Sequence, residues 1–273
     1  MKSIYLSFNF LLFFACRAYS QDTIFLEKYV YNLKKVTVTI GSSSYSFLFD
    51  RGGGETFISP EIARRLGKTC YGNSTGFRMS GEMIRYGKTD SVSLNIGSTP
   101  INHSTIGVWD VMSILPKDLP KLDGVISLKS FHDKIVTLDL ANNRIILETP
   151  PSYKKLIKNK TILQSRFANG PDGNELTIFL GIPNKNRLYW FLFDSGNLDN
   201  LFLSHNTAYE WGLQKDTLAL QKELGSLSIQ IGNKQIKSEA SSEAIIYDGS
   251  LNFSIISSST FIINFHTKQV WMY

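Results

Sequence analysis

Hydrophobic and polar residues alternate along several short stretches of the chain. The clearest are residues 36–40, 92–96 and 227–231, in which every second side chain is aliphatic. A period of two is typical of β-strands with one buried face. Residues 47–49 and 191–193 are apolar at every position, which is typical of strands covered on both faces. The pattern therefore predicts a mainly β protein.

The same order of elements occurs twice in the sequence, and a repeated order indicates a repeated structural unit even at low identity. The matched segments are 36–41 with 47–52 against 176–181 with 191–196; 57–67 against 202–212; 92–97 with Ile101 against 227–232 with Ile236; and 125–131 with closing strands at 135–147 against 255–261 with closing strands at 262–272. We expect two β lobes related by a pseudo-two-fold axis. Each lobe should contain one short helix, which begins after Ser59 or Ser204 and ends at a Gly.

These units also predict the domain boundaries. We expect an N-terminal lobe at 21–150, a linker at 151–160 and a C-terminal lobe at 161–273, because the stretch from Thr149 to Lys160 is polar and contains Pro. The alternative is two unrelated β domains whose similarity is accidental.

Residues 1–20 have the three zones of a secretory signal peptide: Lys2 near the start, an apolar stretch, and Ala18-Tyr19-Ser20 at the end. We expect cleavage after Ser20. The apolar stretch is shorter than the roughly 20 residues that a bilayer span needs, so no transmembrane helix is predicted. The alternative is a lipoprotein anchored through Cys16. Either processing route predicts an exported protein, in the periplasm or cell envelope or secreted.

Composition argues against a disordered, a nucleic-acid-binding and a disulfide-stabilised protein. The chain is 42% hydrophobic and 19% charged, as in ordinary folded proteins, and its formal net charge is +6. The tightest basic run, at 154–160, falls in the expected linker, where solvated lysines are favoured over a nucleic-acid patch. After removal of residues 1–20, Cys70 is the only cysteine, so no internal disulfide can form.

No cofactor or metal is expected. The glycines at 52–54 lack the Lys-Ser/Thr ending of a nucleotide-binding loop. The histidines show no spacing typical of metal ligands; they stand at 103, 132, 205 and 266.

Each fully apolar strand ends in Asp-x-Gly, at Asp50 and at Asp194. A carboxylate after a buried strand is costly unless it is paired or functional. Two such loops related by a pseudo-two-fold axis would set the carboxylates side by side, where they share one proton. One carboxylate can then take a proton from water while the other polarises a carbonyl group.

With these motifs, the chain from about Val36 to Tyr273 resembles the pepsin and retropepsin group of aspartic peptidases, particularly bacterial members with two retropepsin-like halves. The resemblance implies an acid-protease fold with two retropepsin-like lobes. It also implies that Asp50 and Asp194 are catalytic, and that Gly52, Ser195 and Gly196 support the active-site loops. The implied activity is hydrolysis of peptide or unfolded-protein substrates, without cofactor, by a monomer.

Arg51 departs from the Asp-Thr/Ser-Gly motif of that group. Arg is larger, always charged and has no acceptor, and its charge would favour an ionised Asp50. The alternative function is therefore a catalytically inactive peptide-binding protein of the same fold. Ser127 and Ser257 stand where the group has Gly, a symmetrical and smaller change.

A flap is predicted at 76–87, including Gly81 and Tyr86, although an ordinary exposed hairpin explains the same pattern. No catalytic role is assigned to Tyr86. Glycoside hydrolysis by two carboxylates is a third hypothesis, but that chemistry does not require two related loops.

Overall fold

The computed structural model describes residues 21–170, 173, 175–215, 217 and 222–273. The expected signal peptide, with Cys16, lies outside these residues. Within the described part of the chain, no helix is both long and apolar enough to pass through a bilayer.

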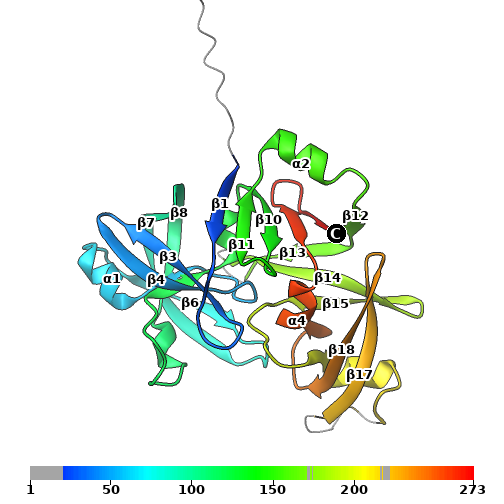
Figure 1. Cartoon of the computed structure of the whole chain (residues 1–273). Helices are drawn as coiled ribbons and strands as arrows, with labels where there is room; N and C mark the ends of the chain where they lie inside the picture. The colour runs from blue at the N-terminus through cyan, green and yellow to red at the C-terminus, as the bar shows by residue number, and fades with distance from the viewer. Residues whose placement is uncertain (1–20, 171–172, 174, 216, 218–221) are drawn as a thin grey trace, which may run out of the picture.

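The described strands form three sheets, and the two halves of the chain form two lobes that lie side by side (Figure 1). The N-terminal lobe holds an eight-stranded sheet, in the order β2 (Glu27–Lys28), β3 (Lys34–Ile40), β4 (Ser43–Phe49), β9 (Gly124–Ile126), β5 (Phe57–Ile58), β8 (Thr99–Val108), β7 (Met83–Ile96) and β6 (Tyr71–Phe77). The C-terminal lobe holds a seven-stranded sheet, in the order β13 (Ser165–Ala168), β14 (Thr177–Asn184), β15 (Arg187–Phe193), β19 (Gly249–Leu251), β16 (Leu201–Ser204), β18 (Lys234–Glu243) and β17 (Lys222–Ile231). The fold is mainly β, as the alternation predicts.

The two lobes repeat one arrangement around the apolar strands. In the N-terminal lobe β4 pairs in parallel with β9, and in the C-terminal lobe β15 pairs in parallel with β19. Each partner strand starts with a glycine, Gly124 or Gly249. A methyl group on either would overlap an aromatic ring of the apolar strand, Phe47 or Phe191 respectively. Glycine is needed here for close packing, because protein cores have no room for extra atoms.

An aspartate precedes each of these glycines and makes equivalent hydrogen bonds in the two lobes. Asp123 Oδ2 accepts from the Ser46 N–H at 3.0 Å, and Asp248 Oδ2 accepts from the Trp190 N–H at 2.7 Å. The backbone carbonyls of the two aspartates accept from Ser59 and Ser204. This repeated Asp-Gly is a signal of the duplication that the sequence comparison overlooked.

The predicted helix of each lobe is present. Helix α1 (Pro60–Arg65) is capped by Ser59 and helix α3 (His205–Glu210) by Ser204, each through a side chain that accepts from a backbone N–H of the first turn. Other helical segments are α2 (Pro150–Leu156), α4 (Phe253–Ser257) and the 3₁₀ turns Val111–Ser113 and Leu128–Phe131. The prediction of a single helix per lobe was therefore incomplete.

A six-stranded sheet joins the two lobes, in the order β1 (Asp22–Phe25), β11 (Arg144–Leu147), β10 (Ile135–Asp139), β20 (Phe261–Asn264), β21 (Gln269–Met272) and β12 (Thr161–Leu163). Strands β10 and β20 come from opposite halves and pair antiparallel. The closing strands thus form a common base. At the expected linker, helix α2 is capped by Thr149 and has Pro at its start, and the Ser152 hydroxyl accepts a reciprocal bond from the Thr149 N–H.

Two details of the predicted repeat are wrong. The strand equivalent to β9 is β19, so Asn252 rather than Ser257 corresponds to Ser127. Asn252 caps α4, which places Ile255 and Ile256 in a helix. The match of 176–181 with 36–41 places Gly181 at the turn of a hairpin, as Gly41 is, but Gly181 lies inside β14 and the turn falls at residues 185–186. A methyl group at Gly181 would lie 2.8 Å from Leu188, so this glycine serves packing instead of the turn.

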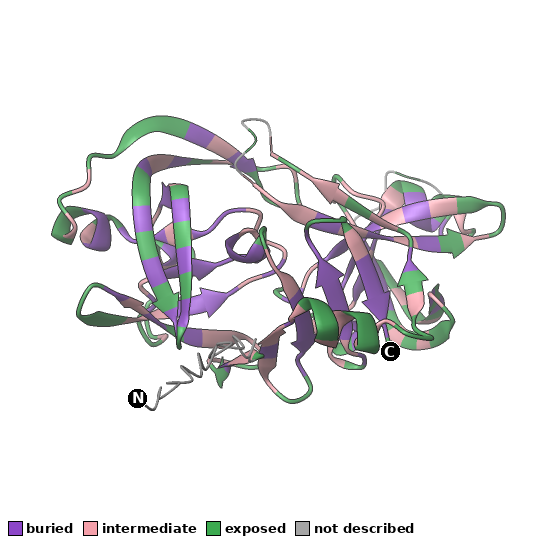
Figure 2. Cartoon of the chain, turned by 90° about the horizontal axis from the view of Figure 1, so that it is seen from above, coloured by how far each residue is buried: buried purple, intermediate pink, exposed green. Residues whose placement is uncertain are grey.

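The largest core cluster contains residues of both halves, including Phe47, Phe131, Phe191 and Phe261. Figure 2 shows buried and exposed residues alternating along the long hairpins. Burying one large apolar side chain contributes about 1.5–3 kcal/mol, so this shared core holds the lobes in a fixed relation.

Candidate active site

The two predicted aspartates sit in equivalent loops. Asp50 directly follows β4 and Asp194 directly follows β15. Asp50 Oδ1 accepts from the Gly52 N–H at 3.0 Å, and Asp194 Oδ1 accepts from the Gly196 N–H at 2.7 Å. Each carboxylate is thereby fixed by its own Asp-x-Gly turn.

The structure brings these carboxylates together. A methyl group on Gly196 would lie 3.1 Å from Asp194 Oδ1 and 3.2 Å from Asp50 Oδ1, so both oxygens approach one point. A methyl group on Gly52 would overlap the Asp194 carboxyl group. Both aspartates line one cavity of about 380 Å³ between the lobes. The glycines of the motif are therefore required by the closeness of the opposite carboxylate.

Both carboxyl groups bind protons more tightly than usual. Burial, followed by the charge of Asp50, raises the pKa of Asp194 to about 7. Burial also raises the pKa of Asp50, although the N–H groups of Gly53 and Gly52 oppose the rise. Below about pH 7 the pair therefore holds a proton, which is the behaviour of two close carboxylates.

Arg51 is the unusual member of the site. Its side chain is 0% exposed, and its guanidinium carbon lies 5.0 Å from the centre of the Phe193 ring. Among the described residues, none accepts a hydrogen bond from its side-chain nitrogens. Burial lowers the pKa of Arg51 to about 9, while the charges of Asp194 and Asp50 oppose the change. At neutral pH a buried cation therefore lies within electrostatic reach of both carboxylates. Ser195, at the equivalent position of the second motif, is also buried.

The predicted flap is a hairpin of β6 and β7 that reaches across to the C-terminal lobe. At its tip, the Ile246 N–H donates to the Met79 carbonyl at 3.0 Å, and Gly81 has a φ of +85°. Tyr86, on β7, packs edge-on against Phe57 with ring centres 4.8 Å apart. Its hydroxyl donates to Glu175 Oε1 of the other lobe at 3.3 Å. The hairpin thus covers the cavity and contacts both of its walls.

No protein-family model and no curated protein sequence matches the chain. Among solved structures, the crystal structure of basic 7S globulin from soybean superposes with a TM-score of 0.56 over 92% of this chain and 94% of that chain, at 7% sequence identity. The chain has the pepsin-like acid-protease fold. At this identity the likeness concerns the fold alone.

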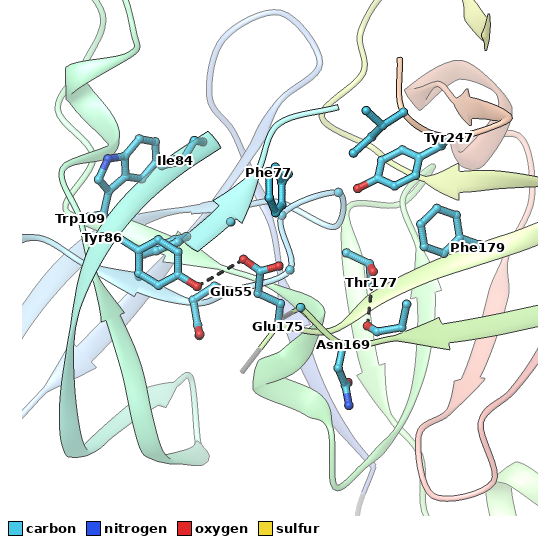
Figure 3. Close-up of a pocket in the computed structure, with 18 residues that line it drawn as sticks. Glu55, Phe77, Ile84, Tyr86, Trp109, Asn169, Glu175, Thr177, Phe179 and Tyr247 are labelled. Atoms are coloured by element: carbon cyan, nitrogen blue, oxygen red, sulfur yellow. Dashed lines mark hydrogen bonds between the residues drawn. The ribbon is translucent and has the colours of Figure 1, made fainter. Parts of the chain in front are cut away.

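Next to the paired aspartates, the pepsin-like cleft contains a second cavity, of about 270 Å³ (Figure 3). Its charged lining residues are both acids, Glu55 and Glu175. Its aromatic lining residues are Phe57, Phe77, Tyr86, Trp109, Phe179 and Tyr247. Several of the residues that line it, among them Gly52, Glu55, Phe57 and Tyr247, also line the cavity of the aspartates, so the two form one continuous cleft.

Sequence reasoning missed both glutamates. Glu55 is 1% exposed and pairs with Lys129, whose Nζ lies 2.8 Å from Oε1 and 2.9 Å from Oε2. Burial raises the pKa of Glu55 to about 7, although Lys129 opposes the rise. An acid directly after the glycines at 52–54 was a usable signal for Glu55. Glu175 has no such signal, because it reaches the site only through the packing of the lobes.

In the described part of the chain, no three His, Cys, Asp or Glu side chains gather in a way that could hold a metal ion. His103 is buried, and its Nε2 lies 3.3 Å from Ser130 Oγ, which is a structural hydrogen bond.

Proposed function

We propose that this chain binds extended peptide segments in the cleft between its lobes, and that Arg51 suppresses their hydrolysis. The observation that carries the proposal is the fully buried Arg51 guanidinium, which is held against Phe193 and within electrostatic reach of Asp50 and Asp194.

The shape and lining of the cleft support peptide binding. The cavity of the aspartates combines apolar side chains of both lobes, such as Leu48 and Leu192, with a few polar groups, which is typical of ligand sites. The flap covers it from one side. Two backbone hydrogen bonds between the lobes close the cleft at its edges: Gly54 of the active-site loop accepts from the Leu176 N–H, and Met79 of the flap accepts from the Ile246 N–H.

The charge of Arg51 explains why turnover should be weak. Hydrolysis by an aspartate pair needs one carboxylate basic enough to take a proton from water. A nearby cation stabilises the ionised carboxylate and so lowers its basicity. With one proton on the pair, the Asp50, Asp194 and Arg51 cluster has no net charge. The negative charge of the carboxylate that should activate water is therefore already balanced by the charge of Arg51.

One observation favours a second function, an aspartic endopeptidase. The carboxylate pair is fully assembled, and burial keeps the pKa of Asp194 at about 7 despite the guanidinium. If the compensation by Arg51 is weak, the pair activates water and cleaves peptide bonds below about pH 7, without a cofactor.

Binding and turnover can be measured in one experiment. The processed chain is incubated with a labelled unfolded protein at pH 4, 5.5 and 7. The bound ligand is recovered, and its mass is measured by mass spectrometry to show whether it is intact. The proposal predicts saturable binding and recovery of intact ligand. Cleavage that Asp194→Asn abolishes would establish the peptidase instead, and absence of binding at every pH would reject both functions.

The cellular location is part of the proposal. We propose export with cleavage after Ser20, and a monomer in the periplasm or cell envelope or secreted. The intact mass of the protein purified from whole cells tests this: the mass of residues 21–273 supports it, an acylated N-terminus at Cys16 indicates the lipoprotein, and retained residues 1–20 contradict both. Light scattering after gel filtration tests the monomer.

A further inference from the structure

The cavity beside the aspartates has an unusual combination of walls. Both of its charged lining residues are acids, while Phe57, Tyr86 and Trp109 form an aromatic side. At about 270 Å³ it is smaller than the roughly 300–1,000 Å³ of pockets for drug-sized ligands, a size suited to a single side chain.

Glu175 lines this cavity close to the flap. Its Oε1 lies 2.6 Å from the position of a methyl group on Gly76 of the flap, and it accepts from the Tyr86 hydroxyl at 3.3 Å. That bond is long for an O–H donor, whose usual distance is about 2.7–2.8 Å. A carboxylate presents about four acceptor positions on its two oxygens, so the Tyr86 hydroxyl is one of several donors that Glu175 can accept from.

Glu55 adds a second negative group on the opposite lobe. Both of its oxygens accept from Lys129 Nζ, at 2.8 and 2.9 Å, and Lys129 itself does not line the cavity. Figure 3 shows both glutamates among the residues that line the cavity. The chain as a whole has a formal net charge of +6, so this acidic interior contrasts with the rest of the protein.

Building on the proposed function, we propose that this cavity binds the side chain of a lysine or arginine of the bound peptide, which makes the protein a receptor for basic peptides. The aliphatic part of such a side chain packs on the aromatic wall, and its charged end reaches Glu175. Burying a cation is costly without a partner, and here the carboxylate supplies charge-assisted hydrogen bonds. Electrostatic complementarity would then decide which peptides bind.

The test uses fluorescent peptides in which one lysine is moved along an otherwise uncharged sequence, each paired with a peptide that has norleucine at that position. Binding to the processed chain is measured by fluorescence polarisation at pH 7.5. At one position lysine should bind at least about tenfold more tightly than norleucine, as expected for a hydrogen bond to a charged group. Glu175→Gln should remove this preference without weakening the binding of the norleucine peptide.

Glu82→Gln is the matched control, because Glu82 lies on the flap tip, pairs with Arg78 and lines neither cavity. It should keep the preference for lysine. A thermal melt of each variant confirms folding. If both peptides of every pair bind equally well to the wild type, or if Glu175→Gln keeps the preference, the inference is wrong although peptide binding stands. If no peptide binds, the proposed function itself fails, and this inference with it.

Discussion

The guanidinium carbon of Arg51 lies 5.0 Å from the centre of the Phe193 ring, and Phe193 immediately precedes Asp194. The residue after one aspartate thus packs against the residue before the other. A cation within about 6 Å of a ring is attracted to its face, which adds about 0.5–2 kcal/mol at most. This is much less than the cost of burying a charge, so electrostatic interaction with the two carboxylates must account for much of the stability of the buried Arg51.

The first prediction concerns pH and stability. The pKa of Asp194 is raised from its ordinary value of 3.8 to about 7 in the folded protein, so the folded state binds more protons between these values. The free energy of unfolding should therefore fall as the pH rises from about 4 to about 7, by a few kcal/mol. Asp194→Asn should make this dependence shallower.

The dependence of the free energy of unfolding on pH should not vanish in Asp194→Asn. The pKa of Glu55 is also raised on folding, from 4.5 to about 7, so Glu55 contributes over a similar pH range. Urea unfolding at half-unit pH intervals measures the effect. Asp199→Asn, which changes an exposed acid nearby, should leave the slope as it is in the wild type. An unchanged slope in Asp194→Asn would contradict the raised pKa.

The second prediction concerns the removal of the buried cation. Arg51→Met keeps a long side chain but removes the charge that opposes protonation of the pair. The pKa of Asp194 should rise above about 7, so the loss of stability with rising pH should extend further and become steeper. The same urea series compares the variant with the wild type, and a shallower dependence in Arg51→Met would show that the guanidinium does not act on the aspartates.

The paired aspartates were predictable from the sequence because the cause is local. A fully apolar strand ending in Asp-x-Gly occurs twice, and each turn fixes its own carboxylate through a bond from the glycine two residues later. The caps at Ser59 and Ser204 are local in the same way. The segment 255–261 was wrongly matched to 125–131, because Ile255-Ile256-Ser257 resembles Val125-Ile126-Ser127. The cap at Asn252 instead places both isoleucines in helix α4.

Long-range packing could not be read from the chain. The pairing of Ile135 with Asn264 joins strands from opposite halves and creates a shared sheet that no local pattern reveals. Glu175 enters the cleft only because the C-terminal lobe packs against the flap. The burial of Arg51 was likewise hidden, since its sequence position gives its charge but not its environment.

The third prediction separates packing from chemistry at Tyr86. Tyr86→Phe keeps the ring and removes the hydroxyl with its 3.3 Å hydrogen bond to Glu175, so the free energy of unfolding should change by less than about 1 kcal/mol. Tyr86→Ala also removes the contact with Phe57 and should cost about 3–5 kcal/mol. Chemical denaturation distinguishes the two. Equal losses in both variants would mean that the hydroxyl, rather than the ring, holds the flap.

The fourth prediction tests the duplicated strand pairing. A methyl group at Gly249 overlaps the Phe191 ring, so Gly249→Ala should destabilise the protein by about 1–3 kcal/mol or prevent its folding. Gly87→Ala is the control, since its nearest neighbour, Cys70 Cβ, would be 3.8 Å away. If Gly249→Ala unfolds at the same denaturant concentration as the control, the close packing of β15 and β19 is not required.

The most direct test of the account is the peptidase activity of Arg51→Thr against an unfolded protein between pH 4 and 7, measured beside the wild type and the double variant Arg51→Thr with Asp194→Asn. We predict that Arg51→Thr cleaves the substrate at a rate at least about tenfold above the wild type, because the carboxylate recovers its basicity. The double variant should be inactive. A wild type that cleaves as fast as Arg51→Thr would contradict the claim that Arg51 suppresses hydrolysis at the Asp50 and Asp194 pair.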